Sequence, residues 1–142
     1  RFMLIDPGTR DQSFYSSFVP RLDHDDAVIR DIQLWLDQSD TRGISIAVLA
    51  ARAGLGERTF LRRFQRATGL NPTDYIQRLR IARAQELLAQ SSQAVDKIGW
   101  ASGYEDTNAF RKTFRKVVGV SPGEYRLRFS IAPRSAADEA ES

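Results

Sequence analysis

Hydrophobic residues recur every three to four positions along most of this chain, which is the spacing of an amphipathic helix. Polar residues fill the intervening positions, and no segment alternates convincingly with the two-residue period of a strand. We therefore expect an all-α protein of seven helices. The predicted helices cover about 26–39, 46–53, 57–68, 72–90, 94–102, 106–118 and 122–125.

Residues that favour helix ends stand at the borders of these segments. Asp25 and Ser45 precede the first two helices, where a side-chain oxygen can accept an N–H group of the first turn. Gly54 and Gly69 follow the second and third helices and can take the positive φ of a helix stop. Pro72 suits the first position of the long helix, because its missing N–H is not needed there.

The sequence of one predicted helix occurs twice in the chain. The segment "ERTFLRRFQRATGLNP" (57–72) recurs as "TNAFRKTFRKVVGVSP" (107–122), with aromatic residues, glycine and proline at matching places. The offset between the copies is 49 residues up to the glycine turn at Gly54 and 50 residues beyond it. Each copy comprises a short helix, a glycine turn, a longer helix, a glycine stop and a proline restart. The sequence therefore predicts two helix-turn-helix units.

The longer helix of each unit has an apolar face and a basic face. We expect the apolar face to be buried, so that it fixes the rotation of the helix and directs the basic face outward. The expected buried residues are Phe60, Phe64 and Ala67 in the first copy and Phe110, Phe114 and Val117 in the second. Aromatic pairs four residues apart are more often core than ligand contacts.

An outward basic helix fits the major groove of DNA, where guanidinium groups bind guanine and amides bind adenine. Phosphate contacts would position the protein without reading the sequence. The expected base contacts are Arg58, Arg62, Asn108, Arg111 and Lys112. The expected phosphate contacts are Thr59, Arg63, Arg66, Arg115 and Lys116.

The helix predicted over 72–90 separates the two units. At ~1.5 Å per residue it would be roughly 28 Å long, and one turn of DNA is about 34–36 Å. A rigid linker of this length could place two reading helices in successive major grooves. This interpretation explains why one monomer carries the same helix twice.

Charge is distributed unevenly. The whole chain has a net charge of +3, whereas residues 52–128 hold 15 basic and 7 acidic residues, a net of +8. A basic block between acidic flanks indicates a polyanionic partner, although a solvated charged surface explains it equally well.

The residue inventory argues against catalysis. Cysteine is absent, and the one histidine, His24, lies in a lead-in segment that we expect to be flexible. Asp23, Asp25 and Asp26 lack the spacing of a calcium loop. We therefore expect neither an enzyme nor a metal or cofactor site. No apolar run approaches the ~18 residues that a membrane span requires, so we expect no membrane partner.

A helical module that binds RNA, single-stranded DNA or protein is the alternative. Such modules stack bases on exposed aromatic rings. Exposure of Phe60 or Phe110 would favour this alternative.

The ordered set of small, aromatic and proline positions closely resembles the DNA-binding domain of the AraC/XylS family over about residues 26–128. The resemblance rests on Leu49-Ala50, Gly54, Phe60, Phe64, Gly69, Asn71-Pro72, "QRLRIARAQELL" (77–88), Ile98, Gly103-Tyr104, Phe110, Phe114 and "GVSPGEYR" (119–126). It implies a seven-helix domain of two helix-turn-helix units joined by a long helix. It also implies control of bacterial transcription, as activator or repressor, in the cytoplasm and at the nucleoid, with RNA polymerase as a further partner.

The resemblance also implies which residues reach bases. The positions are Arg58, Leu61 and Arg62 in the first unit and Thr107, Asn108, Arg111 and Lys112 in the second. Leu61 departs from the polar choice usual in the family. It could contact a thymine methyl group, or the position could be silent.

The lead-in "SFVPRLDHDD" (17–26) and the segment "WLDQ" (35–38) are similar to one branch of the family, in which a DJ-1/PfpI-like domain precedes the DNA-binding part. We therefore expect a ligand-sensing or dimerising domain upstream that this chain lacks. The expected organisation is a linker over 1–24, a first unit over 25–70, a linker helix over 71–91, a second unit over 92–128 and a disordered tail over 129–142.

Overall fold

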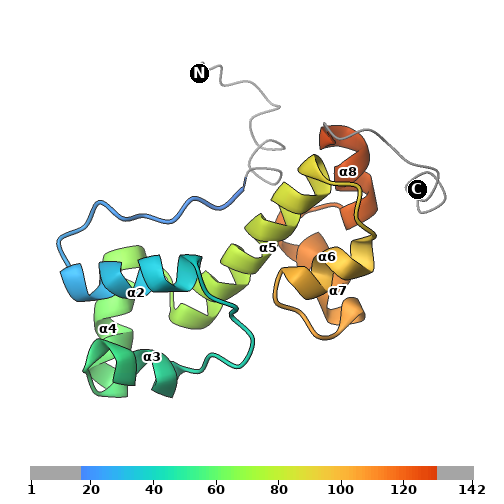
Figure 1. The fold of residues 1–142 in the computed structure, drawn as a ribbon. Helices are drawn as coiled ribbons and strands as arrows, with labels where there is room; N and C mark the ends of the chain where they lie inside the picture. The colour runs from blue at the N-terminus through green and yellow to red at the C-terminus, as the bar shows by residue number, and fades with distance from the viewer. Residues whose placement is uncertain (1–16, 131–142) are drawn as a thin grey trace, which may run out of the picture. The chain divides into compact units, whose positions relative to one another are not determined.

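The computed structural model describes residues 17–130, which form seven helices and no strand (Figure 1). The all-α prediction is therefore confirmed for this part of the chain. The helices are α2 (Ala27–Asp37), α3 (Ile46–Ala53), α4 (Glu57–Thr68), α5 (Pro72–Gln90), α6 (Val95–Ala101), α7 (Thr107–Val118) and α8 (Pro122–Phe129). The expectations for residues 1–16 and 131–142 fall outside the described residues.

The chain divides into two compact units. One unit covers Val19–Arg80 and contains α2, α3, α4 and the first half of α5. The other contains the rest of α5, from Ile81 onward, with α6, α7 and α8. The division falls inside α5, the predicted linker helix, so that each unit contains about half of this helix.

The helix ends follow the predicted caps with one exception. Ser45 caps α3 by accepting the Val48 N–H at 3.2 Å, and Gly54 ends that helix with φ of 72°. The first helix begins one residue later than expected, because the carboxylate that accepts the Ile29 N–H belongs to Asp26. Asp25, the predicted cap, is exposed instead.

Buried aromatic rings form the core of the first unit. Phe60 and Phe64 of α4 are fully buried, with ring centroids 5.6 Å apart. Phe64 also meets Tyr75 of α5 edge to face at 5.1 Å. Because aromatic pairs favour tilted and edge-to-face arrangements, these contacts fix how α4 is rotated about its axis.

The second unit repeats this arrangement on α7. Phe110 and Phe114 are fully buried, with centroids 5.8 Å apart, and Phe114 meets Tyr125 of α8 at 5.7 Å. The third buried residue is Val118, whereas the predicted Val117 is only partly buried and packs beside the core. Phe110, Phe114 and Val118 follow one another in steps of four residues, and this row forms the buried face of α7.

The last helix is longer than expected and carries a buried arginine. The sequence predicted a helix to residue 125, but α8 continues to Phe129. Arg126 is buried and donates to the backbone oxygens of Leu88, Ser91 and Gln93 at 3.3, 3.2 and 2.7 Å. Leu88 lies in the last turn of α5, where helix oxygens lack intrahelical partners and a cation is favoured, and Ser91 and Gln93 follow the helix.

Candidate nucleic-acid interface

Helix α4 buries one face and exposes the other. Phe60, Phe64 and Ala67 are buried, as predicted. The exposed residues of the same helix are Glu57, Arg58, Leu61, Arg62, Gln65 and Arg66. Arginine therefore dominates the outward face, and the buried rings give it a fixed direction. Glu57 stands in the first turn and does not interrupt this basic face.

Three arginines of α4 are available for a ligand. Within residues 17–130, Arg58, Arg62 and Arg66 are exposed and form no ion pair or side-chain hydrogen bond with the protein. A guanidinium group offers five N–H donors in a planar fork that matches guanine edges and phosphate oxygens. Leu61 lies among them and is 37% exposed, so an apolar contact is available at the same surface.

Arg63, a predicted phosphate contact, is engaged within the protein. Its Nε donates to one carboxylate oxygen of Asp26 at 2.9 Å, and a terminal nitrogen donates to the other at 2.8 Å. This hydrogen bonding lowers the pKa of Asp26 below its ordinary value and raises the pKa of Arg63. Thr59, the other predicted phosphate contact on this flank, is half-buried.

Helix α7 repeats the two faces with different polar residues. Phe110, Phe114 and Val118 form its buried face. Its exposed residues are Asn108, Ala109, Arg111, Lys112, Arg115 and Lys116, and Thr107 is half-buried at the first position. Asp106 caps the helix by accepting the Asn108 N–H at 2.9 Å. This cap was not predicted, although an aspartate before a helix is a recognised signal.

One cation of α7 has a neighbour on α6. A terminal nitrogen of Arg111 donates to Asp96 at 3.1 Å, and the two side chains are 47% and 65% exposed. In the first unit, Leu61 and Ala47 occupy the two matching positions, so the pair exists only in the second copy. Lys112, Arg115 and Lys116 have no ion pair within the described chain.

The aromatic rings argue against the single-strand alternative. Phe60 and Phe110, whose exposure would have favoured it, are both fully buried. Trp100 is about half exposed, but it lies on α6 rather than on either basic face. The exposed faces of α4 and α7 thus offer cations and an amide, which suit groove edges and phosphates.

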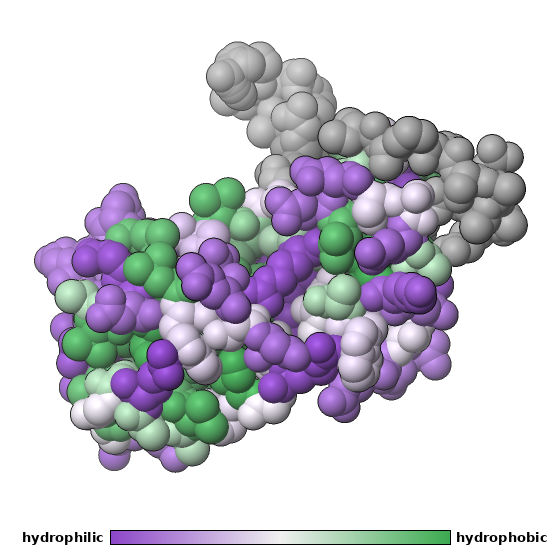
Figure 2. Space-filling view, in the orientation of Figure 1, coloured by the Kyte–Doolittle hydropathy of each residue, from purple (hydrophilic) through white to green (hydrophobic). Residues whose placement is uncertain are grey.

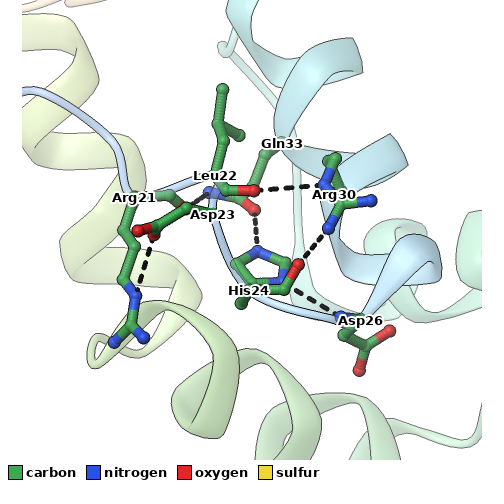
Figure 3. A network of polar contacts seen from close by, with 7 residues as sticks. All are labelled: Arg21, Leu22, Asp23, His24, Asp26, Arg30 and Gln33. Carbon is green, nitrogen blue, oxygen red and sulfur yellow. Dashed lines mark hydrogen bonds and ion pairs between the residues drawn. The ribbon is translucent and has the colours of Figure 1, made fainter.

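The lead-in before α2 is docked, which corrects the expectation that His24 lies in a flexible segment. His24 is buried, and its Nε2 lies 2.7 Å from Oε1 of Gln33 on α2 (Figure 3). The Gln33 amide nitrogen donates in turn to the Arg21 carbonyl at 2.9 Å and to the Tyr75 hydroxyl at 3.1 Å. Both ring nitrogens of His24 are engaged, because Nδ1 accepts the Asp26 N–H at 3.2 Å. This histidine serves the fold of the first unit.

Two other kinds of site are absent from the part of the chain that the structure describes. Residues 17–130 contain no cluster of histidine, aspartate and glutamate suited to a metal ion. None of the helices in this range combines the length and apolar character needed to cross a bilayer. Figure 2 shows hydrophilic residues over much of the visible face, with hydrophobic residues gathered over the unit of α2, α3 and α4.

Comparison with known proteins decides the family. A model of a helix-turn-helix domain matches residues 49–128, a range that begins within α3 and ends within α8. The chain belongs to the AraC-type helix-turn-helix family. Its resemblance to the AraC/XylS DNA-binding domain, which rested on residue patterns alone, is thereby confirmed.

Curated relatives of this family are longer than the chain. The HTH-type transcriptional activator RhaS of Escherichia fergusonii is 36% identical over 101 residues, which cover 71% of the chain and 36% of that protein. RhaS of an Enterobacter species is 33% identical over 111 residues, covering 78% and 40% respectively. The chain therefore spans about two fifths or less of the length of these relatives.

Solved AraC-type domains have the same fold. The DNA-binding domain of AdpA, a global transcriptional factor crystallised with a target DNA, matches with a TM-score of 0.68 at 32% identity, covering 73% of the chain and 94% of that domain. An AraC-type transcriptional regulator from Chromobacterium violaceum matches with a TM-score of 0.68 at 25% identity, covering 75% and 95%.

Proposed function

We propose that this AraC-type chain binds double-stranded DNA in a sequence-specific manner through α4 and α7 and thereby regulates bacterial transcription. The observation that carries the proposal is the repeated division of these helices into a buried aromatic face and an exposed basic face. The crystal structure of the AdpA domain with its target DNA, and the activator RhaS among the relatives, support it.

The exposed residues divide into two roles. Residues on the middle of each outward face reach base edges, and residues on its flanks reach phosphates. The proposed base contacts are Arg58, Leu61 and Arg62 on α4 and Thr107, Asn108, Arg111 and Lys112 on α7. The proposed phosphate contacts are Thr59, Arg66, Arg115 and Lys116, whereas Arg63 is bound to Asp26.

The two helices read two half-sites in successive major grooves. The support is the repeat itself, since two similar reading helices on one chain match two segments of one binding site. The site of action is the bacterial nucleoid in the cytoplasm, with RNA polymerase as a partner. A ligand-sensing or dimerising domain upstream of the lead-in completes the regulator.

A competition experiment separates this function from single-strand or RNA binding. Labelled duplex DNA is bound to the chain and challenged with unlabelled duplex, single-stranded DNA and RNA of equal length, at several salt concentrations. Duplex should compete best. Equal or better competition by RNA or single strands would contradict the proposal.

Arg66→Ala tests the phosphate contacts in the same assay. Arg66 is exposed at the edge of the basic face and has no protein partner among residues 17–130. Removing one phosphate contact should lower affinity on all duplex sequences and reduce the slope of log K against log salt concentration by about one. An unchanged slope would remove Arg66 from the interface.

A further inference from the structure

The ion pair between Arg63 and Asp26 sets one arginine of α4 apart from its neighbours. Along one edge of the Arg63 guanidinium, Nε and one terminal nitrogen donate to the two carboxylate oxygens of Asp26, at 2.9 and 2.8 Å. The side chains are only 33% and 20% exposed, so water screens this pair less than an exposed one. A phosphate oxygen would have to displace the carboxylate to bind the same edge.

Two contacts besides the ion pair with Arg63 hold Asp26 in place. Its carboxylate caps α2 by accepting the Ile29 N–H, and its backbone N–H donates to Nδ1 of His24. Arg30 of α2 donates to the carbonyls of Leu22 and His24, which ties the segment 21–26 to the helix (Figure 3). The backbone of Asp26 is therefore tied to the docked segment through His24, while its carboxylate is held by α2 and Arg63.

Three aspartates of the docked segment lie near Arg63. A surface hollow beside the start of α2 is lined by residues of the segment together with Arg63 and Arg66 of α4. Its acidic residues are Asp23, Asp25 and Asp26, and Arg21, which pairs with Asp23 at 3.2 Å, lines it as well. A phosphate approaching Arg63 from this side would meet the carboxylates of Asp25 and Asp26, and like charges repel.

The restraint is confined to the first unit. The position of the second copy that matches Arg63 is occupied by Thr113, which is half-buried on α7 and cannot form an ion pair. The flanking cations of α7, Arg115 and Lys116, have no ion pair within the described residues. The two units therefore differ in whether an acidic residue holds a flanking cation.

We infer that Asp26 withholds Arg63 from the DNA backbone while the segment 21–26 is docked on α2, and that release of the segment adds Arg63 to the phosphate contacts of the first unit. This inference rests on the proposed function. It makes the lead-in a regulator of DNA affinity, because its docking decides how many cations α4 offers.

Asp26→Asn tests the inference by removing the charge on the partner of Arg63. Asparagine is as good a helix cap as aspartate, so the variant keeps the cap of α2 and loses the charge that binds Arg63. The matched control is Asp25→Asn. It removes one negative charge from the neighbouring residue, whose exposed side chain lines the same hollow. Circular dichroism melts confirm that each variant is folded.

The measured quantity is the slope of log K against log salt concentration on one duplex of fixed sequence. Asp26→Asn should steepen the slope by about 0.9, the value for one added phosphate contact on B-DNA. Arg63→Ala alone should leave the slope unchanged, and Asp26→Asn with Arg63→Ala should return it to the unmodified value. Asp25→Asn should leave the slope unchanged.

A further variant tests the role of the segment. Arg30→Met removes both anchors to the carbonyls of Leu22 and His24, and it should steepen the slope even though it removes a cation. An unchanged slope for Arg30→Met would show that docking of the segment does not control Arg63.

Other results would overturn the inference. A slope reduced by about one in Arg63→Ala would mean that Arg63 reaches a phosphate with Asp26 in place. Equal changes of the slope in Asp26→Asn and Asp25→Asn would show that Asp26 acts only through its negative charge and not through its pair with Arg63. If no variant binds duplex DNA at all, the proposed function fails and the inference fails with it.

Discussion

Gly99 of α6 lies directly against the ring of Phe110 on α7. A side-chain carbon at residue 99 would stand 2.7 Å from Cδ2 and 2.9 Å from Cγ of that ring. The matching position of the first unit is occupied by Ala50, which is buried. The second unit thus has no space for a methyl group where the first unit carries one.

Gly99→Ala should destabilise the chain by ~1–3 kcal/mol, the usual cost of overpacking a core, even though alanine favours a helix more than glycine does. Chemical denaturation measures the change. Gly123→Ala is the control, because nothing lies within 4 Å of the added carbon on α8. A stability loss in the control as large as that of Gly99→Ala would contradict this packing account.

Arg62→Ala and Arg111→Ala should each weaken binding to a cognate site by ~1–3 kcal/mol, if each arginine makes a bidentate base contact. The same changes should matter little on random duplexes, because a lost base contact removes only sequence-dependent energy. Fluorescence anisotropy on both kinds of duplex gives the comparison. Arg128→Ala, which removes a cation paired with Glu124 on α8, is the control. Equal losses on both duplexes would reassign Arg62 and Arg111 to phosphate contacts.

Asp96→Ala should change the stability of the fold by no more than ~1 kcal/mol, because its pair with Arg111 is exposed and water screens it. A thermal melt checks this expectation. A markedly lower melting temperature would show that the pair holds α6 to α7, and would count against Arg111 being available for DNA.

The pair of Asp26 and Arg63 should make stability depend on pH in the acid range. The hydrogen bond from Arg63 lowers the pKa of Asp26 from its ordinary value of 3.8, so the folded state binds this proton less readily than the unfolded state. The stabilisation is therefore complete above pH 3.8 and is lost as the pH falls toward the lowered pKa.

Urea denaturation at neutral pH and near pH 3 measures this dependence. The unmodified chain should be more stable than Asp26→Asn at neutral pH, and the difference should shrink on acidification. A difference that stays constant between the two pH values would show that the carboxylate is not stabilised by Arg63.

Local signals predicted much of the fold. Ser45 and Gly54 delimit α3 because a cap and a positive φ depend on a few neighbouring residues. Phe60 and Phe64 predicted the buried face of α4, since residues four apart share one side of a helix. The extension of α8 to Phe129 was missed, because its basic residues gave no apolar stripe to follow.

Contacts between distant residues were not predictable from the chain alone. Arg63 lies 37 residues from Asp26, and nothing in either local pattern indicates that they meet. The docking of His24 on Gln33 was missed for the same reason, since a polar residue within a helix usually faces water. The sequence thus predicts which residue types form the candidate site. That Asp26 binds Arg63 is known only from the structure.

Selection of bound sequences from a pool of random duplexes tests the central claim most directly. The account predicts enrichment of a site with two conserved blocks whose centres are about 10–10.5 base pairs apart, one for each reading helix. Substituting Arg62 should relax one block, and substituting Arg111 should relax the other. Enrichment of one block alone, or of none, would contradict the claim that α4 and α7 read DNA together.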